Sequence, residues 1–76
     1  MMKRFDPGQL RIKRRRCGLL QSDVAKVLHV TSANVSNMEN GRIRTSAEDL
    51  IALANLYGAK VEDFFVERLE VKNVKN

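Results

Sequence analysis

The stretch QSDVAKVLHVTSANVSNMEN, residues 21–40, decides the fold of this chain. Its apolar residues recur at the three- and four-residue spacings that are typical of helices with one buried face. They are Val24, Ala25, Leu28, Val35 and Met38. This spacing predicts one helix over about 21–28 and a second over about 32–40, with Thr31 suited to cap the second.

The link between these two predicted helices is short. Only His29 and Val30 separate the end of the first helix from the cap of the second. So short a link forces the helices to cross steeply, which is the geometry of a helix-turn-helix. In that motif the second helix enters the major groove of DNA. We therefore predict a helix-turn-helix over residues 21–40 whose second helix contacts DNA.

The outer face of the predicted 32–40 helix is short, uncharged and mostly polar. It consists of Ser32, Ala33, Ser36 and Asn37, which are neighbours on one side of a helix. An ordinary solvated helix face carries lysine and glutamate, and this face carries neither. The alternative interpretation is a helix of modest propensity on a small bundle. We favour a face that approaches base edges, and we expect these four residues to contact bases.

Three further helices are expected on either side of this stretch. A proline at the first helical position predicts a helix over about 7–16. Ser46 predicts the start of a fourth helix, which Gly58 closes, and a fifth begins near Val61. No segment alternates with period two beside a hairpin turn. The sequence therefore predicts one all-α domain over residues 1–76, with five helices and no sheet.

Length and composition exclude several classes of function. A chain of 76 residues forms one small domain, which is too small for a catalytic cleft between two lobes. It has one cysteine, no apolar run of about 20 residues and no signal peptide, so we expect a cytoplasmic protein without membrane association. It also lacks a glycine-rich phosphate loop and any Cys/His set with metal spacing. We expect no enzyme activity, no metal and no cofactor.

Positive charge is concentrated near the N-terminus. Residues 1–20 contain seven basic residues and one acidic residue, whereas residues 47–76 contain four basic and six acidic residues. A polyanion is therefore expected to meet the N-terminal half. A cluster such as Arg14, Arg15 and Arg16 is about as often a solvated helix face, so the cluster by itself does not decide the function.

A set of positions along the chain forms a specific combined pattern. They are Leu10, Arg11, Arg14, Gly18, Leu19, Gln21, Ala25, Val35, Glu39, Asn40, Gly41, Leu53, Ala54, Gly58 and Phe65. Over residues 10–65 this pattern resembles the Cro/repressor-type helix-turn-helix family, also called the XRE type. Four positions depart from it. His29 stands where the family often has glycine, and Leu20 replaces the common Ser or Thr cap. Thr45 stands where proline is frequent, and Lys60 replaces the usual cap of the fifth helix.

The resemblance implies a lambda-repressor-like fold and roles for individual residues. Base contacts are implied for Ser32, Ala33 and Asn37, in line with the outer helix face described above. Phosphate contacts are implied for Gln21, Asn40, Arg42, Arg44 and Arg11. Arg14 and Glu39 match a partly buried ion pair that joins the first and third helices.

The resemblance also implies partners. It predicts a bacterial or phage-encoded transcriptional regulator on the nucleoid, a repressor that binds double-stranded DNA as a homodimer on an inverted-repeat operator. The C-terminal helix and tail, 61–76, are expected to form the dimer contact. Their apolar residues are Phe64, Phe65, Val66, Leu69, Val71 and Val74. A second function stays open, because a small domain of this family can act as an antitoxin or a partner-controlled regulator whose main role is protein binding.

Overall fold

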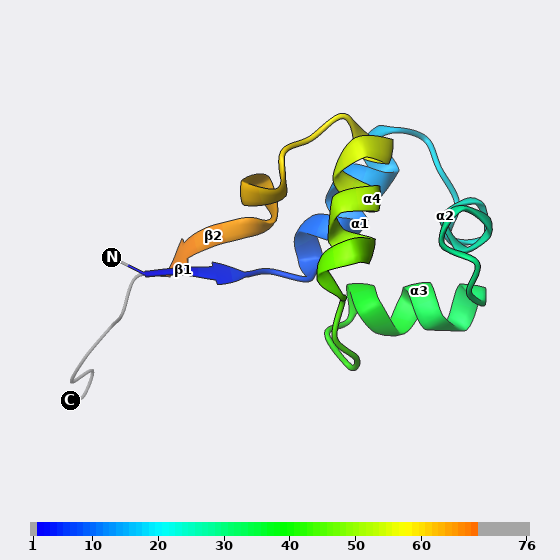
Figure 1. Cartoon of the computed structure of the whole chain (residues 1–76), viewed down its shortest axis with the longest axis horizontal. Coiled ribbons are helices and arrows are strands. Elements are labelled where there is room, and N and C mark those ends of the chain that lie inside the picture. Colours follow the sequence, from blue (N-terminus) through cyan, green and yellow to red (C-terminus); the bar gives the residue numbers. More distant parts are fainter. Residues whose placement is uncertain (1, 69–76) are drawn as a thin grey trace.

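The computed structural model describes residues 2–68. It consists of four α-helices, a short 3-10 turn and a two-stranded sheet (Figure 1). In chain order these are β1 (Met2–Phe5), α1 (Gly8–Arg16), α2 (Gln21–Leu28), α3 (Ser32–Glu39), α4 (Ala47–Tyr57), η1 (Val61–Phe64) and β2 (Phe65–Arg68). No helix among residues 2–68 is long and apolar enough to cross a membrane.

The prediction of five helices and no sheet is wrong at both ends of the chain. The segment that was expected to be a fifth helix is the 3-10 turn η1, followed by the strand β2. This strand pairs antiparallel with β1, so that Phe5 lies opposite Phe65 and Met2 opposite Arg68. The two strands stand at opposite ends of the sequence, and no hairpin turn marks their pairing. The remainder of the expected C-terminal helix and tail, residues 69–76, lies outside the described residues.

The four α-helices and η1 enclose one core. Its buried residues are Leu10, Val24, Ala25, Val35, Met38, Leu50, Leu53, Ala54, Tyr57 and Phe64. The apolar positions predicted to face inward on α2 and α3 are among them, with the exception of Leu28, which is half-buried against the core. Phe64 is fully buried, and η1 contacts both α1 and α4. The 3-10 turn therefore closes the core between α1 and α4.

The helix caps position the helix-turn-helix. Thr31 Oγ1 accepts a hydrogen bond from Asn34 N–H at 3.1 Å, which confirms the predicted cap of α3. Ser46 Oγ accepts from Asp49 N–H at 3.0 Å at the start of α4. Leu20 offers no side-chain acceptor to α2, but its own N–H donates to the Asp23 carboxylate at 2.8 Å. The start of α2 is thus held by half of a capping box.

Candidate nucleic-acid interface

The turn between α2 and α3 has the tight geometry that the sequence predicts. His29 ends α2 with a φ of 59°, in the left-handed region that favours glycine. The next residue, Val30, donates its N–H to Ala25 C=O at 3.0 Å. These two features turn the chain within a few residues, and α2 packs directly on α3. Figure 1 shows the two helices together at the end of the molecule that lies opposite the sheet.

The α3 helix has one buried side and one side that faces solvent. Val35, Met38 and Glu39 are buried. Ser32 and Ala33 are exposed, whereas Ser36 and Asn37 are half-buried. The four residues predicted to contact bases therefore share the accessible side of α3.

An ion pair joins α1 to α3 beneath this surface. Arg14 Nε donates to Glu39 Oε2 at 2.6 Å, and Arg14 Nη2 donates to Glu39 Oε1 at 3.1 Å. Burial by itself raises the pKa of Glu39. The hydrogen bonds from Arg14 and Gln21 and the positive charge of Arg14 outweigh burial and hold that pKa below its usual value. The structure thus brings together the two residues that the resemblance paired.

Two residues expected to contact phosphate, Gln21 and Arg11, lie against the same carboxylate, and Arg11 links a third, Asn40, to them. Gln21 Nε2 donates to Glu39 Oε1 at 3.1 Å. Arg11 Nε lies 3.5 Å from the same oxygen, and Arg11 Nη2 donates to Asn40 Oδ1 at 2.7 Å. The sequence pattern did not indicate these links, because they join residues that are distant along the chain. Glu39 therefore ties the start of α2, the middle of α1 and the end of α3 into one network.

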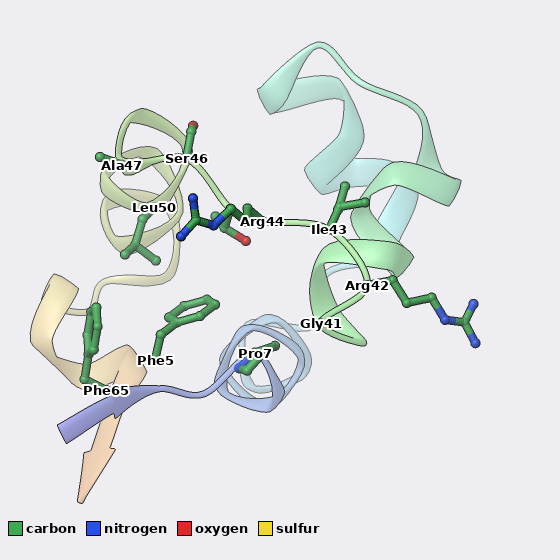
Figure 2. Close-up of a pocket in the computed structure, with 11 residues that line it drawn as sticks. Phe5, Pro7, Gly41, Arg42, Ile43, Arg44, Ser46, Ala47, Leu50 and Phe65 are labelled. Carbon is green, nitrogen blue, oxygen red and sulfur yellow. The ribbon is translucent and has the colours of Figure 1, made fainter. Parts of the chain in front are cut away.

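The loop after α3 is anchored to the end of that helix. Arg42 N–H donates to Asn37 C=O at 2.9 Å, and Ile43 N–H approaches the same oxygen at 3.4 Å. The side chains of Arg42 and Arg44 take different directions. Figure 2 shows Arg42 extending away from the body, whereas Arg44 turns toward Leu50, over an open groove beside the sheet. Of these two arginines, Arg42 is the one whose side chain extends away from the body in this structure.

The structure divides the basic residues near the N-terminus among several places. Lys3 and Arg4 lie in β1, at the opposite end of the molecule from α2 (Figure 1). Arg14 is buried in the ion pair, and the Lys13 ammonium lies 5.6 Å from the centre of the Phe64 ring. The N-terminal excess of charge therefore does not form one surface beside α3.

The metal-ligating residue types are not clustered in the described part of the chain. Among residues 2–68, no group of three or more His, Cys, Asp or Glu side chains is placed to hold a metal ion. The accessible chemistry around α3 is that of amides, hydroxyls and guanidinium groups. These groups bind by hydrogen bonding and charge.

Comparison with known proteins identifies the family. The sequence model of the family described as helix-turn-helix domain matches residues 8–64 of this chain. The fold is similar to that of the P22 c2 repressor protein in complex with synthetic operator 9T, with a TM-score of 0.71 and 18% identity over 80% of this chain and 92% of that one. It is also similar to a transcriptional regulator from Listeria innocua, with a TM-score of 0.70 and 23% identity over 96% of this chain and 67% of that one. No curated protein matches the sequence. Since the family model spans most of the chain, the recognition of a Cro/repressor-type motif is confirmed, and the chain belongs to the helix-turn-helix domain family.

Proposed function

We propose that this chain is a transcriptional regulator, a repressor, that binds double-stranded DNA by placing α3 in the major groove. The observation that carries this proposal is the accessible side of α3, which presents short uncharged side chains. The buried Arg14–Glu39 ion pair holds the opposite side of α3 in place. A helix can enter the major groove only if its outer side chains are small enough to let it approach the base edges. The P22 c2 repressor, which shares the fold, was solved with a synthetic operator and supports the same use here.

The four residues on that side of α3 differ in what they can recognise. The Asn37 side-chain amide has the donor and acceptor needed to form two hydrogen bonds with adenine. Ser32 and Ser36 can donate to, or accept from, several bases. The methyl group of Ala33 suits contact with the methyl group of thymine. Asn37 is therefore the residue that we expect to contribute most to sequence preference.

Phosphate contacts are proposed around the C-terminal end of α3. Gln21 gives one amide hydrogen to Glu39 and keeps a second for a phosphate at the positive end of α2. Asn40 and Arg42 follow directly after α3, and Arg44 reaches a phosphate if its side chain rotates out of the groove. Arg11, bound to Asn40, adds positive charge beside them.

The groups proposed to bind phosphate are linked to α3 by hydrogen bonds. Gln21 and α3 meet at the Glu39 carboxylate, and Arg42 is held by Asn37 C=O. Phosphate contacts fix the register of a protein on the duplex, and base contacts give the sequence preference. Because of these hydrogen bonds, binding to the phosphates would set the depth and angle of α3 in the groove.

We further propose that the operator is an inverted repeat bound by a homodimer. One helix contacts only a few base pairs, and each sound contact contributes about 1–3 kcal/mol. A genome contains about a million or more competing sites, so one helix gives too little discrimination. Two copies contact twice the sequence and double the phosphate contacts. The half-site centres should then lie about 34–36 Å apart.

Footprinting of the DNA upstream of the gene for this protein tests the proposal. The expected result is protection of a short, two-fold symmetric segment at protein concentrations that leave unrelated duplexes unprotected. Uniform weak protection of all duplexes, at every salt concentration, would contradict sequence-specific regulation.

A further inference from the structure

The two-stranded sheet ends in open edges. Within residues 2–68, β1 pairs only with β2, and no third strand joins either of them. Figure 1 shows this pair extending from the helical body at the end opposite α2. An isolated two-stranded sheet is marginally stable in water, and an open strand edge is a template for pairing with another chain. The projecting pair is therefore a candidate interaction surface.

The hydrogen-bonding pattern shows which groups of β2 point outward. Asp6 N–H donates to Phe64 C=O at 2.8 Å, which makes 6 and 64 a hydrogen-bonded pair in the antiparallel ladder. Such pairs alternate along antiparallel strands, so Val66 and Arg68 also direct their backbone groups toward β1. Phe65 and Glu67 direct theirs to the outer edge. Phe65 N–H already donates to Glu62 C=O, which leaves Phe65 C=O, Glu67 N–H and Glu67 C=O for another strand.

At residues 3 and 4, the outer edge of β1 is unsuited to pairing with a copy of itself. By the same alternation, Lys3 and Phe5 direct their backbone groups outward on β1. A two-fold axis at residue 3 would place Lys3 opposite Lys3, and an axis at residue 4 would place Arg4 opposite Arg4. Like charges directly opposite each other are destabilising, and lysine on an edge strand discourages pairing.

Of the symmetric registers centred at residues 65, 66 and 67 on the outer edge of β2, one avoids such repulsion and uses backbone groups that are still available. An axis at residue 65 would need two Phe65 N–H groups, which already donate to Glu62 C=O, and an axis at residue 67 would oppose two Glu67 carboxylates. An axis at residue 66 instead places Val66 opposite Val66 and Glu67 opposite Phe65. β-branched residues directly opposite each other stabilise antiparallel pairs.

We propose that two copies of this chain associate through β2, in antiparallel register with Val66 on the two-fold axis, to form a four-stranded sheet. Glu67 N–H donates to the partner subunit's Phe65 C=O, and the reciprocal bond follows from symmetry. The partner subunit's Glu67 then extends the row that Phe5 and Phe65 form on one face, where their rings lie edge to face with centroids 5.7 Å apart. The inference rests on the proposed homodimeric regulator and names the surface that makes the homodimer.

This surface differs from the broad C-terminal contact that the sequence suggested. Phe64, which was expected to contribute, is fully buried in the core of its own chain and is inaccessible to a partner. Leu69, Val71 and Val74 lie outside the described residues. Phe65 and Val66 are half-buried and lie in β2 itself. The contact is therefore a strand edge with Val66 at its centre.

A pair of proline variants tests the proposed edge. Proline removes a backbone N–H and is tolerated on an edge strand where that N–H faces outward. Glu67→Pro should raise the dimer dissociation constant at least about tenfold, because two intermolecular hydrogen bonds are lost. Lys3→Pro is the matched control, since Lys3 lies directly opposite Glu67 on the other edge, and it should leave self-association unchanged. Sedimentation equilibrium measures both, and helical circular dichroism verifies folding.

Cysteine cross-linking tests the register independently of any loss of folding. In a Cys17→Ser background, Val66→Cys should form an intermolecular disulfide in a glutathione redox buffer, because opposed residues in a non-hydrogen-bonded pair have Cα atoms about 4.5 Å apart. Arg4→Cys is the control on the same face. Its two copies would lie about 14 Å apart, three strand spacings away, and should not cross-link.

The DNA readout separates this inference from the proposed function. If both are right, Glu67→Pro binds a single half-site as the parent does but loses the tight binding of a two-half-site duplex. If the parent binds no duplex specifically, the proposed function fails, and the self-association measurements still judge the interface. The inference is overturned if Glu67→Pro associates as tightly as Lys3→Pro, if Val66→Cys fails to cross-link, or if the parent remains monomeric both alone and on a two-half-site duplex.

Discussion

Arg14 and Glu39 form a two-pronged ion pair between α1 and α3, with both side chains buried. The pair lies directly under the proposed DNA-contacting helix, and the Glu39 carboxylate also accepts a hydrogen bond from Gln21. Arg14 donates a further bond to Leu19 C=O at 2.8 Å, in the turn that leads to α2. One buried pair therefore fixes the relative positions of three helices.

Removing one member of this pair should strongly destabilise the fold. Glu39→Ala strands the Arg14 guanidinium in the interior, and losing one partner of a buried pair costs about 3–5 kcal/mol. A chain of this size is only marginally stable, so we expect a large fall in Tm. The measurement is a thermal melt followed by circular dichroism. The double variant Arg14→Met with Glu39→Leu should recover part of the loss, because it leaves no unpaired charge. A Glu39→Ala melt that matches the parent would show that the pair contributes nothing to stability.

Tyr57 should ionise far above the usual range. Burial, together with the negative charge of Glu39, raises the pKa of Tyr57 from 10.0 to about 12. A raised pKa of an acid means that the folded state holds the proton more tightly, so this contribution to stability is complete below pH 10 and is lost between pH 10 and 12. We expect a loss of about 2 kcal/mol over that window. Tyr57 is the single tyrosine of the chain, so phenolate absorbance follows it directly.

Tyr57→Phe is the control for the alkaline transition. The free energy of unfolding of the parent should fall by about 2 kcal/mol relative to that of Tyr57→Phe as the pH rises from 10 to 12, since only the parent carries the titrating phenol. A phenolate midpoint near 10 in the folded protein would show that Tyr57 is open to water.

The turn of the helix-turn-helix should be stabilised by glycine. His29 adopts a φ of 59°, which costs a side chain with a Cβ about 1–2 kcal/mol. His29→Gly removes that strain but loosens the unfolded chain, so we expect a net gain of about 0.5–1 kcal/mol in a urea denaturation experiment. Gly58→Ala is the converse control, because it adds a Cβ at a position with a similar left-handed conformation. Gly58 has a φ of 66° with no atom within 4 Å of an added Cβ, so its cost should be purely conformational. A His29→Gly protein less stable than the parent would indicate that the imidazole makes a compensating contact.

The helix-turn-helix was predictable because its signals are local. The apolar spacing within each helix, which includes Val24 in α2 and Val35 in α3, extends over only one or two turns, and both residues are buried. The caps at Thr31 and Ser46 are equally local, and both are present in the structure. The left-handed turn at His29 falls at the position where the family often has glycine.

The sheet and the polar network were not predictable in this way. Phe5 and Phe65 pair across nearly the whole chain, and no turn sequence records a contact of that range. Aromatic and β-branched residues favour a strand, and three of them stand together at Phe64, Phe65 and Val66. The segment was nevertheless predicted as a helix, because the segments before it have helical periodicity. The bond from Gln21 to Glu39 depends on how α2 crosses α3, which only the packed structure defines.

The two proposed kinds of DNA contact should respond differently to mutation. Asn37→Ala should reduce the preference at one base position by about 1–3 kcal/mol and leave binding to unrelated duplexes nearly unchanged. Arg42→Ala should weaken binding to all duplexes alike and reduce the salt slope by about one, because one phosphate contact is lost. Fluorescence titrations over a panel of single-base operator variants, at several salt concentrations, give both quantities. An unchanged ranking of the panel with Asn37→Ala would exclude Asn37 as a base contact.

The central claim is that the chain recognises a two-fold symmetric sequence in double-stranded DNA through α3. The most direct measurement is selection of bound duplexes from a random-sequence pool by the purified parent chain at physiological salt. The account predicts enrichment of an inverted repeat whose half-site centres lie about 10–10.5 base pairs apart, with Asn37→Ala relaxing one position in each half-site. A bound pool that remains as random as the starting pool would contradict it.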